Sequence, residues 1–263
     1  MGRESPHASL ASHDDWALRG ATIPNRIDVS ATCTFRQQAR VIAAEIRGRK
    51  YETILELGVY PGQILAYLAS AHGLRATGLE YVAQQAIAVR QAFPEVEVIE
   101  GDMFSDDWRK GFPQWDIGCS FGLVEHWADP RAAIKRQLRF VAPGGCCIIA
   151  IPNHSGPYGA IMKWIDPDMY SRHSGISCSQ LELSFRDVAG DVWAISYCST
   201  LEGAGFWNCG AAEWVAQRRP AVRWLLSKSL AVWHRFVTPI PVPRLFRPNV
   251  MLVARHRNSN DLA

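Results

Sequence analysis

The sequence contains no long apolar run, no strong excess of charge and no secretory signal, and each absence removes a class of protein. No stretch of its 263 residues approaches the ~20 consecutive apolar residues that span a bilayer, so we expect no stable membrane insertion. The formal net charge at pH 7 is +3, which does not indicate a nucleic-acid partner. The N-terminus reads Met-Gly-Arg-Glu-Ser-Pro-His, without the apolar segment of a signal peptide.

The seven cysteines form no C-x-x-C pair and no Cys/His pair at zinc-ligand spacing. Cys119, Cys146 and Cys147 fall in predicted buried strands. Because disulfides are rare in reducing compartments, we interpret the cysteines as reduced thiols in a cytoplasmic protein. Nothing in the sequence fixes the oligomeric state, and a homodimer is compatible with it.

The most informative segment is 54–62, Ile-Leu-Glu-Leu-Gly-Val-Tyr-Pro-Gly, which is followed 24 positions after Glu56 by Glu80. An apolar strand, a glycine turn that opens a helix, and a second apolar strand ending in an acid form a nucleoside-binding βαβ unit. Glycine lets the backbone approach a ligand closely, and an acid about 20 residues on accepts hydrogen bonds from ribose hydroxyls. The turn reads Glu-x-Gly-x-x-x-Gly, and an acid before its first glycine suits a cationic ligand better than a pyrophosphate.

Residues 1–30 are polar and irregular, but from Thr34 to about residue 155 helical patterns and apolar strand patterns alternate, which indicates a parallel sheet with both faces covered. We expect strands at 53–57, 75–79, 95–100, 116–121 and 146–151, and helices at 63–72, 83–92 and 131–140. A helix is also predicted from Thr34 onward and another at 178–189.

These motifs resemble those of the class I S-adenosylmethionine-dependent methyltransferases. The segment 54–62 resembles motif I of that family, with Tyr60 in place of the usual small residue. Further motifs follow in family order at 100–103, 115–126 and 141–145. The resemblance implies an α/β fold with a seven-stranded, Rossmann-like, doubly wound sheet, mostly parallel with an antiparallel last strand, and S-adenosylmethionine as cofactor.

The resemblance also implies a division of the single domain at 1–263. We expect an N-terminal lid and helix, a cofactor-binding core, a cap over the acceptor pocket, and the last strands, at 1–50, 51–155, 156–195 and 196–263. Residues 197–204 are expected to form the helix before the sixth strand, 206–211 that strand, and 249–254 the last, antiparallel strand. An insertion at 212–237 carries an amphipathic helix, 221–237, before the last strand.

Carried onto this sequence, the family's motifs imply a set of cofactor contacts. Asp102 is expected to take the adenine amino group, with Met103 or Phe104 packing on the ring. The full set of predicted cofactor-binding residues is Glu56, Gly58, Tyr60, Gly62, Glu80, Tyr81, Asp102, Met103 and Phe121.

Histidines and aromatic residues outside the cofactor motifs are the candidates for the acceptor side. We predict His173 and His126 as catalytic bases, because imidazole titrates near working pH. The predicted substrate-binding residues are Trp16, Trp127, His154, Tyr158 and Tyr170. Glu125, His126 and Asp129 form an alternative metal site, but no other clear oxygen ligand accompanies them, and we predict no metal.

The sequence therefore predicts methyl transfer from S-adenosylmethionine to N or O of a small, aromatic or heteroaromatic metabolite, as in secondary metabolism. One alternative is a lipid or quinone methyltransferase that docks on membranes through the basic, Trp-rich helix 221–237. A second alternative is a non-catalytic nucleoside-binding protein.

Overall fold

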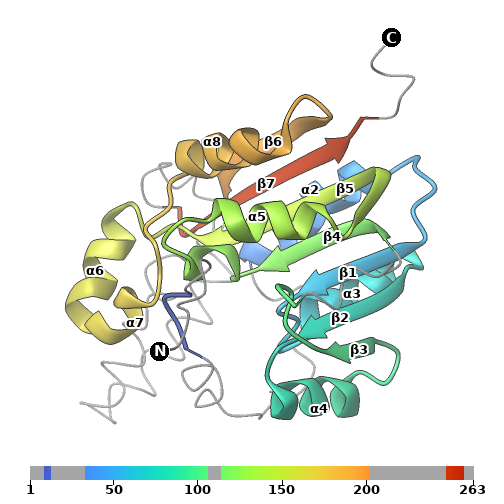
Figure 1. Cartoon of the computed structure of the whole chain (residues 1–263), viewed down its shortest axis with the longest axis horizontal. Coiled ribbons are helices and arrows are strands. Elements are labelled where there is room, and N and C mark those ends of the chain that lie inside the picture. Colours follow the sequence, from blue (N-terminus) through green and yellow to red (C-terminus); the bar gives the residue numbers. More distant parts are fainter. Residues whose placement is uncertain (1–8, 13–32, 106–113, 202–246, 258–263) are drawn as a thin grey trace.

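The computed structural model describes residues 9–12, 33–105, 114–201 and 247–257. Those residues form one seven-stranded sheet with helices on both sides (Figure 1). The strand order is β3-β2-β1-β4-β5-β7-β6. In chain order the strands are Thr53–Leu57 (β1), Arg75–Glu80 (β2), Glu97–Glu100 (β3), Trp115–Phe121 (β4), Val141–Pro152 (β5), Trp193–Leu201 (β6) and Asn249–His256 (β7).

Strands β1 to β5 pair in parallel, whereas β7 runs antiparallel to both of its neighbours, β5 and β6. The strand order reverses between β1 and β4, and ligands of such sheets bind beyond the carboxyl ends of the strands at that reversal. The predicted seven-stranded, mostly parallel sheet with an antiparallel last strand is confirmed.

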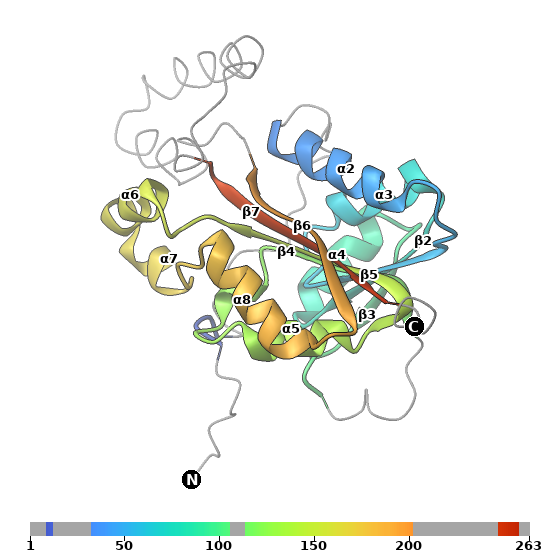
Figure 2. The same ribbon diagram turned by 90° about the horizontal axis from the view of Figure 1, so that it is seen from above.

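The helices cover both faces of the sheet, as Figure 2 shows from above. They are Cys33–Ile46 (α2), Gln63–His72 (α3), Ala83–Ala92 (α4), Arg131–Leu138 (α5), Pro157–Ile165 (α6), Pro167–Ser171 (α7) and Cys178–Ala189 (α8), with a short 3₁₀ helix, Val124–His126 (η3). Among the described residues, no helix is long and apolar enough to cross a membrane.

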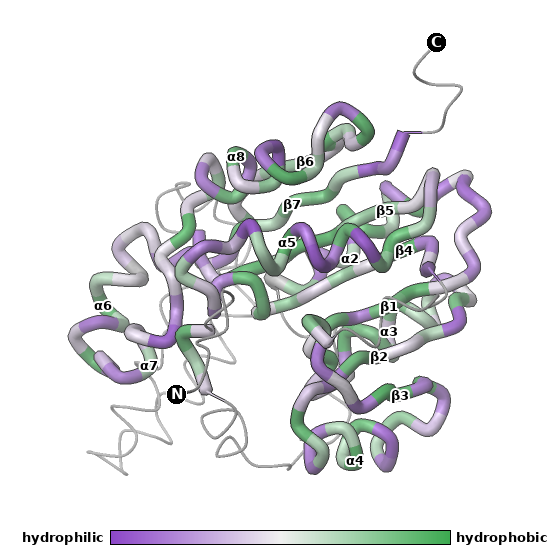
Figure 3. The backbone as a smooth tube through the Cα atoms, viewed as in Figure 1, coloured by the Kyte–Doolittle hydropathy of each residue, from purple (hydrophilic) through white to green (hydrophobic). Residues whose placement is uncertain are grey.

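Alternation along the strands divides the core into two layers. Ile54 and Ile148 belong to the buried cluster that α2, α3 and α4 cover, whereas their neighbours Leu55 and Ile149 belong to the cluster under α5 and α8. Figure 3 shows the hydrophobic stretches along β1, β5 and β7. Because both faces of these strands are buried, their sequences are nearly continuous apolar runs.

Local signals fix the ends of the helices that frame the site. Helix α3 lies between Gly62 and Gly73, which both have left-handed backbone angles. Helix α8 begins with a capping box, in which Ser177 Oγ accepts from the amide of Gln180 and the Gln180 side chain accepts from the amide of Ser177.

One predicted element was wrong. Residues 197–204 were expected to be helical, but residues up to Leu201 belong to β6, which pairs with β7 along Trp193–Leu201. The alternation of Trp193 and Ile195, which pack in the same buried cluster, suits a strand, and α8 takes the place of the expected helix. The predicted strand 206–211 and the predicted helix 221–237 lie outside the described residues.

Candidate active site

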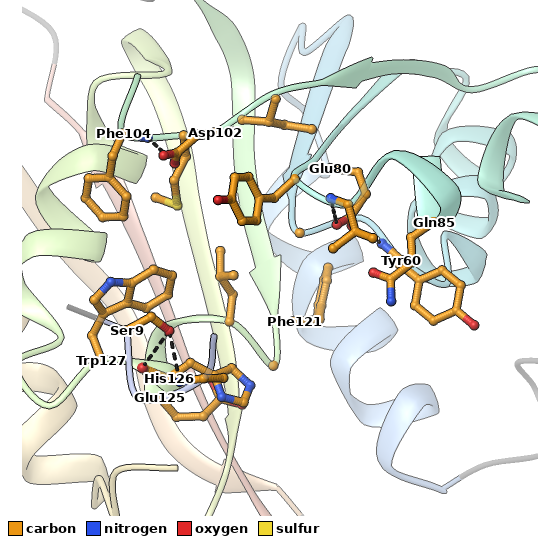
Figure 4. Close-up of a pocket in the computed structure, with 18 of the residues that line it drawn as sticks. Ser9, Tyr60, Glu80, Gln85, Asp102, Phe104, Phe121, Glu125, His126 and Trp127 are labelled. Carbon is orange, nitrogen blue, oxygen red and sulfur yellow. Dashed lines mark hydrogen bonds and ion pairs between the residues drawn. The ribbon is translucent and has the colours of Figure 1, made fainter. Parts of the chain in front are cut away.

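A cavity of about 650 Å³ opens at the carboxyl ends of β1, β2 and β4. In the close-up, Glu80 and Asp102 lie toward one end and Glu125, His126 and Trp127 toward the other (Figure 4). Of the predicted site residues, the structure brings together around this cavity Gly58, Tyr60, Glu80, Tyr81, Asp102, Met103, Phe121, His126, Trp127 and His173.

The turn after β1 approaches the cavity through Gly58. Its φ is +68°, and a Cβ at this position would lie 3.0 Å from Leu123 Cδ1. The amides of Gly58 and Val59 both donate to the carbonyl of Leu79, at 2.9 and 3.2 Å, so the turn is fastened to the end of β2. The backbone at Gly58 therefore presents a surface without a side chain to the cavity.

Glu80 ends β2 and is held at the cavity wall. Its Oε2 accepts from the amide of Tyr60 and its Oε1 from the amide of Val82, each at 3.1 Å. Burial raises the pKa of the carboxyl, while the hydrogen bonds from Val82 and Tyr60 act against that rise. The side chain of Tyr60, the departure from the expected turn, packs against the buried cluster under α3 and α4 and lines the cavity.

Glu56 and Gly62 lie beneath the turn and do not line the cavity. Glu56 is 4% exposed, and its Oε2 is buried without a hydrogen-bond partner among the described residues. Burial, and then the neighbouring Glu80, raise the pKa of this carboxyl well above its ordinary value. A Cβ at Gly62 would lie 2.8 Å from Val89, so this glycine permits close packing of α3 on α4. Cofactor contacts by these two residues stay a prediction.

The segment after β3 supplies an acid and two apolar side chains. Asp102 Oδ1 accepts from the amide of Phe104 at 2.8 Å and so fixes its own turn. Met103 is buried, and the rings of Phe104 and Trp127 lie 5.6 Å apart. Phe104 lines the cavity as well as Met103. Both residues that the sequence offered for packing on the adenine ring are thus at the cavity.

Histidines from distant parts of the chain meet at the other end of the cavity. The rings of His126 and His173 lie 4.4 Å apart, and the ring of His154 lies 4.9 Å beyond that of His173. His126 is 1% exposed, as is Glu125, whose Oε1 lies 4.0 Å from His126 Nε2. Imidazoles thus line this end of the cavity beside a buried carboxyl group.

Backbone carbonyls orient the two histidines that line the cavity. His126 Nδ1 lies 2.8 Å from the carbonyl oxygen of Arg172, and His173 Nδ1 lies 2.7 Å from that of Met169. Since a carbonyl oxygen accepts but cannot donate, each Nδ1 carries a proton, and in the neutral ring each Nε2 is an acceptor.

Of the remaining predicted acceptor residues, the two whose side chains the structure describes, His154 and Tyr170, do not line the cavity. His154 lies behind His173, and burial together with His173 lowers its pKa to about 4. The ring of Tyr170 lies 6.4 Å from that of His154. Trp16 and the side chain of Tyr158 lie outside the described residues, so their roles stay predictions.

A short N-terminal segment closes the cavity, and sequence analysis assigned no individual role to its residues. Ser9 pairs with Trp127 as an isolated antiparallel bridge, and the amide of Leu10 donates to the carbonyl of His126 at 2.6 Å. Ser9, Ala11 and Ser12 line the cavity. The sequence analysis predicted an N-terminal lid in general but did not predict this contact.

The sequence of this chain is similar to those of known methyltransferases. A family model described as "Methyltransferase domain" matches residues 55–149. Demethylmenaquinone methyltransferase of Chlorobaculum tepidum is 29% identical over 132 residues, which cover 47% of this chain and 52%, or about half, of that protein. Trans-aconitate 2-methyltransferase of an Azoarcus species is 24% identical over 188 residues, covering 67% of this chain and 72% of that one.

Solved structures show the same fold at low identity. The [4+2]-cyclase SpnF superposes with a TM-score of 0.58 at 17% identity, covering 86% of this chain and 82% of that chain. The plantazolicin methyltransferase BamL, in complex with a triazolic desmethylPZN analog and SAH, also has a TM-score of 0.58, at 13% identity over 88% of this chain and 87% of that chain.

Proposed function

Because the chain belongs to the class I S-adenosylmethionine-dependent methyltransferases, we propose that it transfers a methyl group from S-adenosylmethionine to N or O of a small aromatic or heteroaromatic acceptor. The observation that carries this proposal is the position of Glu80, held by two amides at the cavity wall beside the Gly58 turn. The proposal places the reaction in the cytoplasm and includes no nucleic-acid partner.

The described residues fit the nucleoside part of this cofactor. The Glu80 carboxylate is fixed at the end of β2, where it would accept from the two ribose hydroxyls. Gly58 leaves a cradle that a Cβ would fill. Asp102 stands at the same end of the cavity as Glu80, where it would take the adenine amino group. The next residue, Met103, also lines the cavity and would pack on the adenine ring.

When bound, the cofactor supplies an electrophilic sulfonium methyl, whose bond to sulfur breaks as the bond to the acceptor atom forms, leaving a neutral thioether. The chain's own residues then have to orient the acceptor, exclude water and receive the acceptor's proton. His126 and His173 line the acceptor end with Nε2 as the acceptor atom, and we assign them to assisting the removal of that proton.

A small, flat acceptor suits the space and its lining. A cavity of about 650 Å³ has to hold both the cofactor and the acceptor, which leaves little room for a large substrate. Trp127, the residue after His126, offers aromatic surface at the acceptor end, and its ring packs against that of Phe104. Aromatic surface favours an aromatic partner.

A quinone acceptor is the second candidate, and the similarity to a demethylmenaquinone methyltransferase supports it. On that proposal the chain docks on membranes through the predicted basic helix 221–237. The fold alone does not decide the reaction, because one neighbour of the same fold is named as a [4+2]-cyclase.

The test of the proposed function is transfer of a labelled methyl group from S-adenosylmethionine to a panel of small phenols and N-heterocycles. Labelled product from at least one member is expected, together with calorimetric binding of both S-adenosylmethionine and S-adenosylhomocysteine. No heat with either nucleoside, or binding of NAD in their place, would overturn it. Co-sedimentation with anionic vesicles that salt reverses would favour the quinone candidate.

A further inference from the structure

We propose that Glu125, His126 and His173 form a binding site for a divalent transition-metal ion at the acceptor end of the cavity. The inference rests on the proposed function and deepens it, because it concerns the same cavity. With the ion bound, the two Nε2 atoms would hold the metal, and the histidines would assist removal of the acceptor's proton through the ion and not as bases themselves. It also departs from the sequence-based expectation of no metal.

The three donors already lie close together. One ligand atom from each of Glu125, His126 and His173 lies within 4.8 Å of the others. Donors about 2.1 Å from a tetrahedral zinc ion are ~3.4 Å apart, so bound metal would require the present triangle to contract by roughly 1 Å. Rotations of the three side chains would have to supply this contraction.

The orientation of both imidazoles is that of metal ligands. A ligating histidine commonly donates its other ring N–H to a backbone carbonyl, which fixes the tautomer and the ring plane. His126 meets this condition at the carbonyl of Arg172, and His173 at the carbonyl of Met169. Both Nε2 lone pairs are thus in the tautomer that binds a cation.

Hydrogen bonds to the main chain hold Glu125 close to His173. The amide and the hydroxyl of Ser174 both donate to the carbonyl oxygen of Glu125, at 2.7 and 2.8 Å. This double hydrogen bond ties the residue after His173 to η3, which carries Glu125 and His126. The fold therefore maintains the approach of the three ligands at the level of the main chain.

The donor set selects the kind of ion. Two imidazoles and one carboxylate suit Zn²⁺, Fe²⁺ or Co²⁺, whereas Mg²⁺ and Ca²⁺ prefer sites made of oxygen. All three residues line the cavity, so positions not filled by protein ligands face the acceptor. An acceptor with a coordinating oxygen, such as a phenol or an enol, would be oriented there, and its hydroxyl pKa lowered.

The alternative ligand Asp129 is not part of this site. Its carboxylate is bound by Arg131, with Oδ1 2.8 Å from Nε, on the outer surface of the chain. Asp129 therefore serves as a matched control for Glu125, because both are acids near the end of β4 and only one lines the cavity.

The experiment measures metal content of the full chain. The protein is stripped with a chelator, incubated with Zn²⁺ or, as a spectroscopic probe, Co²⁺, and freed of unbound ion. We expect about one ion per chain, a Co²⁺ absorption spectrum typical of imidazole ligands, and a Zn²⁺-dependent rise in the thermal midpoint. Retention of no ion by the wild-type chain, with no change in its thermal midpoint, would overturn the site.

Variants locate the ion. His173→Ala and Glu125→Gln should each weaken Zn²⁺ binding by at least ~100-fold, the upper range for loss of a supporting hydrogen bond alone. Asp129→Asn and His72→Ala, which change an acid and a histidine outside the cavity, should bind as the wild type does. Equal binding by all four variants would show that the ion sits elsewhere and would refute the assignment.

Calorimetry with S-adenosylhomocysteine on the stripped protein separates this inference from the proposed function. Nucleoside binding without metal retention would overturn the metal site and leave the methyltransferase proposal standing. Metal retention without nucleoside binding would support the site and overturn the cofactor assignment.

Discussion

Glu80 Oε2 accepts a hydrogen bond from the amide of Tyr60 at 3.1 Å, which joins the acid that ends β2 to the glycine turn that follows β1. The same carboxylate accepts from the amide of Val82, at the start of α4. One side chain therefore fixes two loops of the cavity wall. It does so with a buried carboxylate that lines the cavity, where it would also accept from a ligand's hydroxyls.

Replacement of Glu80 tests its assignment to the cofactor. Glu80→Ala should weaken binding of S-adenosylhomocysteine by about 1.5–3 kcal/mol, roughly 10- to 150-fold in Kd, as hydrogen bonds to a charged group are lost. Glu80→Gln keeps an acceptor for the turn but loses the charge, so a smaller loss is expected. Calorimetry measures both, with exposed Glu97→Gln on β3 as the control. Unchanged affinity in Glu80→Ala would contradict the assignment.

Gly58 and Gly48 form a matched pair for the turn itself. Both have positive φ, +68° and +76°, but a Cβ meets Leu123 at 3.0 Å only at Gly58. Gly48→Ala should therefore show backbone strain alone, about 1–2 kcal/mol in the free energy of unfolding. Gly58→Ala should lose the same amount of unfolding free energy and a further amount from the close contact of the new Cβ with Leu123. It should also bind the cofactor more weakly. Urea denaturation and calorimetry of the two variants provide the measurement, and equal behaviour would contradict a ligand-facing role for Gly58.

The sequence was sufficient for the parallel half of the fold because its signals there are local. Strand 53–57 and helices 63–72 and 83–92 were predicted with the observed bounds, since each is an apolar run or a helical pattern bounded by a glycine, a proline or a polar turn. Strand β6 was missed because its inward residues Trp193 and Ile195 alternate with small residues that also suit a helix.

The acceptor end of the site was only partly predictable, because it is assembled by contacts between distant segments. Nothing in the sequence places His173 against His126, and the approach depends on the bond from Ser174 to Glu125. The contact of Ser9 with Trp127 spans an even longer separation. Such pairings follow from tertiary packing, which periodicity and motif spacing do not encode.

Glu56 should make stability depend on pH. Its raised pKa means that the native state keeps a proton which the unfolded chain releases above about pH 4.3. The native state binds more protons at Glu56 over that range, so the contribution of this group to stability is fully present below the unfolded pKa and is lost as pH rises toward the folded pKa. For one proton the slope is at most about 1.4 kcal/mol per pH unit.

Glu56→Gln removes this titration. As pH rises from about 4.3, the wild type should lose free energy of unfolding through Glu56, whereas the variant should not. The variant should therefore become more stable relative to the wild type. Urea denaturation at a series of pH values measures that difference. A difference that stays constant across the pH series would contradict the raised pKa of Glu56.

The N-terminal segment should matter for turnover and not for cofactor binding. The Leu10 amide donates to the carbonyl of His126, and Ala11, only 4% exposed, lines the acceptor end of the cavity. Deleting residues 1–12 opens that end to water and should abolish methyl transfer, because a dry site strengthens the interactions that orient the acceptor. Calorimetric affinity for S-adenosylhomocysteine should stay unchanged.

A single substitution separates the hydrogen bond of Leu10 from the rest of the segment. Leu10→Pro removes the N–H and should lower kcat by about five- to tenfold, the equivalent of one hydrogen bond of ~1 kcal/mol. Leu10→Ala keeps the N–H and should retain wild-type kcat, since the Leu10 side chain is 38% exposed. Steady-state kinetics with the acceptor found in the methyl-transfer panel measures both. Full activity in the deletion, or equal kcat in the two Leu10 variants, would mean that the segment covers the cavity without contributing to the reaction.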